Sequence, residues 1–224
     1  MARCTPLPRA SLLRAAPRLL LFPASLRRHS HQRRLIGYFA ALIGRACHVD
    51  ILDAGEVDLP IFNQDLEGSA PVLDRVVAVH RRFNAADGII VASPEYNGHV
   101  SPYLKNTVDW VSRLARIDGR YAAETPFRGK PLLLASASTG WTGGILGLQD
   151  ARTIFSYLGC LVSAEQICIS DADRWTIEDQ FRFETAFAAY IERVLAAFLS
   201  LVGNLANPDA AHTEESGRES LACA

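Results

Sequence analysis

The chain has 224 residues, of which 49% are hydrophobic, and a formal net charge of -1. This length and hydrophobic content are enough for one substantial core, and length alone favours a single domain. A net charge this close to zero gives no general attraction to nucleic acid or to an anionic membrane, so neither is an expected partner.

The amino-terminal end carries the one marked charge asymmetry. Nine arginines precede the first acidic residue, Asp50, and residues 1–17 contain no acid. Arg14 and Arg18 interrupt the apolar centre that a secretory signal would need. A mitochondrial-type presequence, an overlong start and a floppy extension all fit residues 1–17; we expect a disordered extension and a cytoplasmic protein.

The cysteines and the apolar runs exclude two further classes. The five cysteines are scattered, with no CxxC pair and no histidine at metal-ligand spacing. This pattern is typical of buried or incidental thiols in a reducing compartment, and it predicts no metal site. No continuous apolar run approaches the roughly 20 residues that span a membrane.

From residue 18 onward, apolar runs alternate with apolar residues at helical spacing. The runs that predict buried strands are Arg18–Phe22, His48–Leu52, Gly88–Ala92, Pro131–Ala135 and part of Leu161–Ile169. The segments that predict helices are Ser30–Arg45, Val72–Phe83, Ser101–Ala115, Ile145–Leu158 and Ile177–Leu201. The alternation predicts an α/β fold over residues 18–202, with a doubly wound, five-stranded parallel sheet of order 2-1-3-4-5 and helices on both faces. Residues 203–224 are polar and predict a disordered tail.

Three loops are rich in residues that could bind a ligand, and the first of them, residues 23–32, follows the first strand. In this topology the winding reverses between strands 1 and 3, and ligands bind at that edge. The loop ends at a helix start, where free N–H groups favour a phosphate. Its polar side chains are Ser25, Arg27, Ser30 and Gln32. The alternative is that Ser30 is only an N-cap.

The second and third loops follow strands 3 and 4 and would share the same edge. A connecting turn uses Pro, Asn and Gly for their backbone preferences, but it needs no Tyr or Glu. The second loop nevertheless has all five together: Pro94, Glu95, Tyr96, Asn97 and Gly98. The third loop, 135–144, has glycines that allow a ligand to approach the backbone and Trp141 as an aromatic face, although it could also be a flexible crossover. A phosphate end on the first loop and a flat ring between the other two describe a mononucleotide with a planar aromatic head.

Other nucleotide-binding and hydrolytic patterns are missing from the sequence. It has no GxGxxG after the first strand and no GxxxxGK[ST] motif, which argues against a dinucleotide Rossmann domain and a P-loop NTPase. It also has no GxSxG elbow, so the scattered Ser, His and Asp residues indicate no hydrolase triad.

The loop sequences resemble the NAD(P)H-dependent FMN reductases, a flavodoxin-like family that includes quinone, azo-dye and chromate reductases. The resemblance covers roughly Arg18 to Ile169. It rests on Ala24-Ser25-Leu26-Arg27-x-x-Ser30-x-Gln32, Ser93-Pro94-Glu95-Tyr96-Asn97-Gly98, Leu104-Lys105-Asn106-x-x-Asp109-Trp110, Gly129-Lys130-Pro131, and Gly143-Gly144 with Arg152. The activity it implies is electron transfer from NADH or NADPH through bound FMN to a quinone, azo, metal-oxyanion or free-flavin acceptor.

The resemblance also implies roles for individual residues. The first loop would bind the FMN phosphate, the second would lie along the isoalloxazine ring, and the third would meet the ring's other edge. The implied contacts are Ser25, Arg27, Ser30 and Gln32; Pro94, Glu95, Tyr96, Asn97 and Gly98; and Ser138, Thr139 and Gly140. The motif on the following helix would serve packing and a dimer contact. The family implies a homodimer or homotetramer and no obligatory catalytic side chain.

Two features leave rival interpretations open. The family's usual Gly-Ser at the start of the first loop is Pro23-Ala24-Ser25 here, and its usual Asn is Gln32. A reshaped phosphate turn would be typical of a non-catalytic relative that has lost FMN. An FMN-binding electron carrier is the other alternative, although the chain lacks a carrier's strong acidity.

Overall fold

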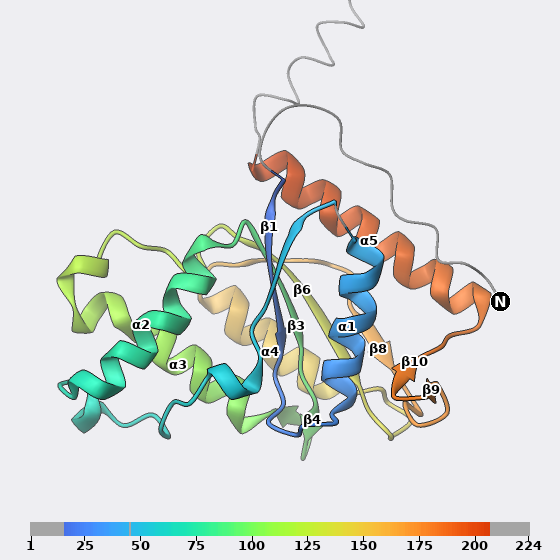
Figure 1. Cartoon of the computed structure of the whole chain (residues 1–224), viewed down its shortest axis with the longest axis horizontal. Coiled ribbons are helices and arrows are strands. Elements are labelled where there is room, and N and C mark those ends of the chain that lie inside the picture. Colours follow the sequence, from blue (N-terminus) through green and yellow to red (C-terminus); the bar gives the residue numbers. More distant parts are fainter. Residues whose placement is uncertain (1–15, 45, 207–224) are drawn as a thin grey trace, which may run out of the picture.

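A six-stranded parallel sheet forms the centre of the computed structural model, which describes residues 16–44 and 46–206 (Figure 1). Its strand order is β2-β1-β3-β6-β7, with β8 also paired to β6. The strands are β1 Arg18–Pro23, β2 His48–Ile51, β3 Gly88–Ala92, β6 Pro131–Ala137, β7 Leu161–Val162 and β8 Ile167–Ile169. The α/β fold and the parallel sheet are therefore confirmed. Most of the expected extension and tail, residues 1–15 and 207–224, lies outside the described residues.

The one difference within the sheet is that the expected fifth strand is two short strands. β7 pairs with the start of β6 and β8 pairs with its end. Arg152 fills the gap between them, because its guanidinium donates to the Ser163 carbonyl at 2.8 Å and to the Gln166 side chain at 3.2 Å. The interruption therefore leaves a polar group, not a void, at this edge of the sheet.

Helices cover both faces of the sheet. They are α1 His31–Ile43, α2 Ala70–Ala85, α3 Pro102–Ile117, α4 Ile145–Tyr157 and α5 Thr185–Ala206. α1 and α5 pack on the face that receives Leu19 and Leu21, and α2, α3 and α4 pack on the face that receives Leu20 and Phe22. Because successive strand residues point to opposite faces, the apolar run of β1 serves both cores at once.

The expected last helix begins later than its periodicity indicated. Residues within the expected start, 177–184, belong instead to an antiparallel hairpin of β9, Thr176–Ile177, and β10, Gln180–Phe181. Its two turn residues, Glu178 and Asp179, have φ of 49° and 61°. A two-residue hairpin turn needs positive φ at both positions, and these residue types give little signal for it. The prediction of a helix from residue 177 is therefore wrong, and α5 continues to Ala206.

Among the described helices, α5 is the one that is long and apolar enough to cross a membrane, with a mean hydropathy of 1.6. A helix at the core of a protein can pass the same test. The side chains of Ile191, Leu195 and Phe198 on α5 belong to the core that α1 and the sheet share. Because 28% of this apolar window is buried, the packing covers only part of the apolar surface of α5.

Lys130, in the Gly129-Lys130-Pro131 stretch, closes the end of α2. Its ammonium group donates to the carbonyls of Phe83, Asn84 and Ala86 at 2.6, 2.6 and 2.7 Å. These carbonyls are at the end of a helix, where the last acceptors have no partner within the helix. Burial lowers the pKa of Lys130 to about 8, so the charged form still predominates at neutral pH.

Replacing Lys130 with Met should therefore destabilise the fold. We expect the free energy of unfolding to fall by about 1–3 kcal/mol, because three partly buried carbonyls lose a charged donor. Chemical denaturation followed by far-UV circular dichroism measures the change. Lys105→Met is the matched control, since that lysine pairs with Asp109 on the surface and should matter by about 0.5 kcal/mol or less. Equal losses in the two variants would contradict this role.

Candidate functional site

The three loops meet because the strands before them end in one row. Pro23 of β1 pairs with Ala92 of β3, and Ala92 pairs with Ala135 of β6. The loop after β1 (loop 1, residues 24–30), the PEYNG segment (residues 94–98) and the loop after β6 (loop 3, residues 138–144) therefore leave the same edge of the sheet. This is the carboxyl edge, beside the point where the strand order reverses.

Loop 1 is fixed at its first residue. The N–H of Ala24 donates to the Ala92 carbonyl at 2.8 Å, and the Ser101 hydroxyl donates to the Ala24 carbonyl at 2.7 Å. Within residues 23–30 of the described chain, no residue has a positive φ. Pro23 and Ala24 are therefore compatible with this path, and the turn here needs no glycine.

Several backbone donors of loop 1 have no acceptor. Ser30 is the N-cap of α1 and accepts from the Arg33 N–H at 3.1 Å, so it does have a capping role. In the part of the chain that the structure describes, nothing accepts from the N–H groups of Leu26, His29, His31 and Gln32. Free N–H groups at a helix start, with the dipole of α1 behind them, form a site for an anion such as a phosphate.

The side chains of loop 1 have different partners. Ser25 is buried and accepts from the Arg27 N–H at 3.3 Å, while the Arg27 side chain is exposed, with no ion pair to another described residue. The Gln32 amide pairs with Ala137, donating to its carbonyl at 2.7 Å and accepting from its N–H at 3.1 Å. Gln32 thus ties α1 to the end of β6, and its backbone N–H is the group that remains available.

The PEYNG segment is a small hairpin. β4, Glu95–Tyr96, pairs with β5, His99–Val100, across Asn97 and Gly98, whose φ values are 53° and 77°. Asn-Gly is the preferred pair for such a turn, so the sequence did contain the hairpin signal. The sequence analysis treated the segment as a connecting turn and did not predict the two short strands.

Glu95 fastens this hairpin to α4. Its carboxylate accepts from the Gly147 N–H at 3.0 Å, in the first turn of α4, where negative charge is favoured. A Cβ on Gly147 would come within 3.0 Å of the His99 carbonyl. Asp150 adds a second link, accepting from the Val100 N–H at 3.3 Å. The hairpin and the start of α4 therefore form one unit.

Loop 3 is close-packed at its base and open at its tip. A Cβ on Gly144 would overlap the Ser136 hydroxyl oxygen and lie 2.8 Å from that residue's Cβ. Ser138 accepts from the Gly140 N–H at 3.1 Å, whereas Thr139 is exposed and Trp141 is 86% exposed. The two glycines before α4 thus serve packing, and the exposed residues at the tip are those that a ligand can reach.

His29 in loop 1 and His31 at the start of α1 face acidic residues in and near the β9–β10 hairpin. His31 lies 3.2 Å from Asp173, and His29 lies 3.7 Å from Asp179. Burial, and then the charge of Arg34, lower the pKa of His31. His31 is therefore neutral at pH 7 and adds no positive charge to the anion site.

The motif on α3 holds the long segment between β2 and α2. Asn106 accepts from the Phe62 N–H at 2.7 Å and donates to the Pro60 carbonyl at 2.9 Å. The Trp110 indole donates to the same carbonyl at 2.8 Å. These contacts give Asn106 and Trp110 a packing role; Lys105 and Asp109 pair with each other on the surface.

The family described as NADPH-dependent FMN reductase matches residues 17–173, more than half of the chain. A quinone reductase of Escherichia coli K12 is 28% identical over 150 residues, covering 61% of this chain and 76% of the relative. An NAD(P)H-dependent FMN reductase of Pseudomonas aeruginosa is 30% identical over 143 residues, covering 63% and 70%. FerB of Paracoccus denitrificans, a flavoenzyme NAD(P)H:(acceptor) oxidoreductase, has a similar fold, with a TM-score of 0.72, 22% identity, and coverage of 84% and 98%.

Glu95 should be needed more for its contact than for its acidity. We expect Glu95→Ala to lower the free energy of unfolding by about 1 kcal/mol, as loss of a helix cap does. Glu95→Gln keeps an acceptor oxygen for the Gly147 N–H and should cost less than half as much. Thermal unfolding of the two variants beside the unaltered chain measures both. A larger loss for Gln than for Ala would contradict the contact.

Proposed function

Because the chain belongs to the NADPH-dependent FMN reductase family, we propose that it transfers two electrons from NADH or NADPH, through bound FMN, to a small quinone-type acceptor. The observation that carries the proposal is the set of free N–H groups in loop 1, next to a hairpin that forms a rigid unit with α4. This pairing offers a phosphate site and a ledge for a flat ring at the same edge of the sheet.

Each loop has a proposed part in holding FMN. The phosphate would lie at the start of α1, where Ser30 and Ser25 shape the turn and Arg27 adds positive charge. The ring would lie along the hairpin and face the tip of loop 3. The proposed contacts are Ser25, Arg27, Ser30 and the N–H of Gln32; Pro94, Glu95, Tyr96, Asn97 and Gly98; and Ser138, Thr139 and Gly140.

The protein's own contribution is binding and electrostatics. FMN held there would supply the redox chemistry between the nicotinamide and the acceptor. The backbone N–H groups of Asn97, Thr139 and Trp141 have no acceptor among the described residues, and they would donate to polar edges of the ring. Donors fixed in this way stabilise the negative charge of a reduced ring at no cost in rearrangement. No side chain of the site needs to act as an acid or base.

The acceptor class is supported by the relatives. Proteins similar to this chain are described as a quinone reductase of Escherichia coli and a 2-hydroxy-1,4-benzoquinone reductase of a Burkholderia species. A quinone is flat and can stack in the place that the nicotinamide leaves. Azo compounds, metal oxyanions and free flavin are further candidate acceptors for an open site of this kind.

We also propose a homodimer, with a homotetramer as a further assembly, in the cytoplasm. Exposed apolar side chains surround the site, with Leu26 67%, Leu146 55% and Trp141 86% exposed. Contact with a second copy would cover such side chains.

The first test of the function is the visible spectrum of the purified chain after addition of FMN. We expect a bound-flavin spectrum that bleaches under anaerobic NADH or NADPH and returns when a benzoquinone is added. Bound flavin that neither coenzyme bleaches would favour an electron carrier. A chain that retains no flavin would favour a relative that has lost the cofactor.

Arg27 should act on the phosphate and not on the ring. We expect Arg27→Gln to weaken FMN binding about tenfold, the effect of losing roughly 1.4 kcal/mol of charge-assisted bonding. Binding of riboflavin, which has the ring but no phosphate, should change by less than twofold. Flavin fluorescence titration measures both. Equal losses for the two ligands would place Arg27 away from the phosphate.

A further inference from the structure

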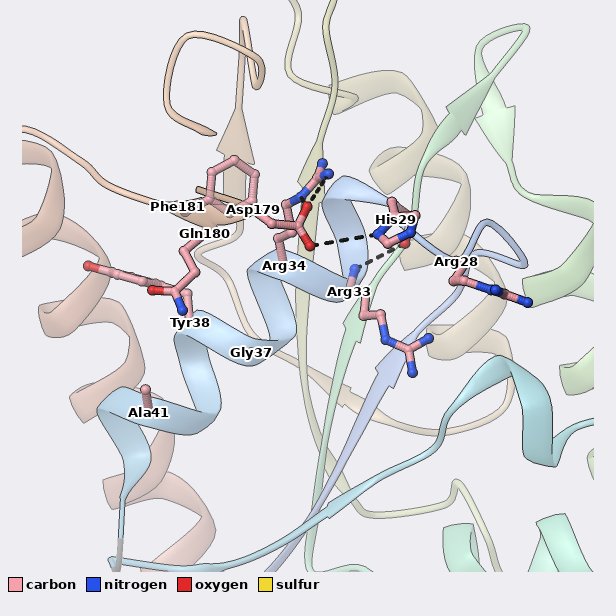
Figure 2. A pocket seen from close by; sticks show the side chains of 11 residues that line it. Arg28, His29, Arg33, Arg34, Gly37, Tyr38, Ala41, Asp179, Gln180 and Phe181 are labelled. Atoms are coloured by element: carbon pink, nitrogen blue, oxygen red, sulfur yellow. Dashed lines mark hydrogen bonds and ion pairs between the residues drawn. The ribbon is translucent and has the colours of Figure 1, made fainter. Parts of the chain in front are cut away.

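A pocket of about 350 Å³ lies between α1 and the tip of the β9–β10 hairpin (Figure 2). It begins at the end of loop 1 and continues along the outer surface of α1. The residues along it include Arg28, His29, Ser30, Gly37, Tyr38 and Phe181. Its volume is at the lower end of the range for small-molecule sites. The pocket therefore adjoins the proposed phosphate site and extends away from it.

Positive charge at the loop 1 end of this pocket is incompletely neutralised. Arg34 is held by Asp179, the one acidic residue of the lining, with Nε and Oδ1 2.7 Å apart. Arg33 pairs with Asp53. Arg28 has no carboxylate partner anywhere in residues 16–44 and 46–206, and Figure 2 shows its side chain extending away from Asp179. This end of the pocket suits an anion, because one guanidinium group can donate to two phosphate oxygens at once.

The middle of the pocket is open because Gly37 has no side chain. A Cβ there would meet nothing within 4 Å. Tyr38, which is partly exposed, adds aromatic surface beyond it, whereas Phe181 lies buried beneath the pocket. A flat heterocycle can lie over the bare helix surface at Gly37, so the pocket offers a phosphate site and a ring site within one cavity.

We propose that this pocket binds the adenosine 2′-phosphate part of NADPH, with the 2′-phosphate at Arg28 and the adenine over Gly37. The proposal rests on the proposed function, because it assumes that the nicotinamide end of the same molecule reaches the flavin. The pyrophosphate would then follow loop 1, from which the pocket begins. A ligand with both a phosphate and a purine matches the two ends of the cavity better than a simple anion does.

Three arginines on or just after α3 are poorer candidates for binding a 2′-phosphate. Arg113 is held by Glu67 at 2.8 Å, and Arg120 is held by Asp118 at 2.6 Å. α3 starts at the carboxyl edge of the sheet, and its 16 residues carry the chain about 24 Å away from it. Arg116 belongs to the last turns of that helix. It is exposed, with no ion pair to any described residue, and is therefore a matched control for Arg28.

The test measures binding and turnover on the full chain loaded with FMN. Calorimetry with adenosine 2′,5′-bisphosphate gives a dissociation constant that needs no redox activity. We expect Arg28→Gln to raise this constant about tenfold and to lower kcat/KM for NADPH about tenfold, with less than twofold change for NADH. Arg116→Gln should change none of these values.

A second variant tests the ring site separately. Gly37→Leu fills the hollow, and it favours the helix because Gly is a poor helix former. We expect it to weaken adenosine 5′-monophosphate and the bisphosphate alike, at least fivefold, with an unfolding temperature no lower than that of the unaltered chain. An unchanged affinity for both nucleotides in this variant would contradict the binding of adenine over Gly37.

Two results separate this proposal from the proposed function. In one, Arg28→Gln binds the bisphosphate with unchanged affinity, while both coenzymes still reduce the flavin. This result would contradict the proposed NADPH pocket and leave the proposed function intact. Flavin that neither coenzyme reduces, in a chain that binds the bisphosphate through Arg28, would overturn the function and still support a site for adenosine phosphates.

Discussion

The arrangement of the site depends on how the backbone of Ala24 is held. Its N–H extends the ladder between β1 and β3, and its carbonyl accepts the hydroxyl of Ser101, the N-cap of α3. Loop 1 is thereby tied to the helix that follows the PEYNG hairpin. Since the strand order reverses between β1 and β3, this one residue links the two halves of the sheet at the edge where folds of this kind bind ligands. The positions of the free N–H groups in loop 1 follow from that anchor.

The polar residues of the site divide into those that hold the protein and those that remain available. Gln32 and Glu95 use their side chains on the Ala137 backbone and the Gly147 N–H. Arg27 and Asn97 make no such side-chain contact with another described residue. Buried polar groups are expensive unless they are paired, so the fixed set makes a stiff frame. The free set and the backbone donors then face a ligand without first breaking bonds within the protein.

The fold was predictable from the sequence because its signals are local and mutually consistent. Gly88–Ala92 is a buried strand with the same bounds in the prediction and in the structure. The break between β7 and β8 was not predictable, because the group that fills it, Arg152, comes from another element. The hairpin before α5 was missed because Glu178 and Asp179 have no turn signature. For the site, the sequence indicated which loops carry many polar side chains. It could not show that the side-chain amide of Gln32 is hydrogen-bonded to β6, because that contact joins residues 105 positions apart.

The misjudged hairpin also shapes the charge next to the site. Left-handed backbone at Glu178 and Asp179 is unfavourable for such residues and persists only where the surroundings hold it. The pair between Asp179 and Arg34 provides that hold, and Asp179 also faces His29. The unfavourable turn conformation thus positions the Asp179 carboxylate beside Arg34, whose charge it neutralises. Because Asp53 neutralises Arg33 in the same way, the uncompensated charge of the amino-terminal half of α1 is left at loop 1, on Arg27 and Arg28. Of the four arginines in this segment, two are neutralised by carboxylates and two are not. The remaining positive charge therefore lies at the start of α1, where a phosphate would meet the helix dipole.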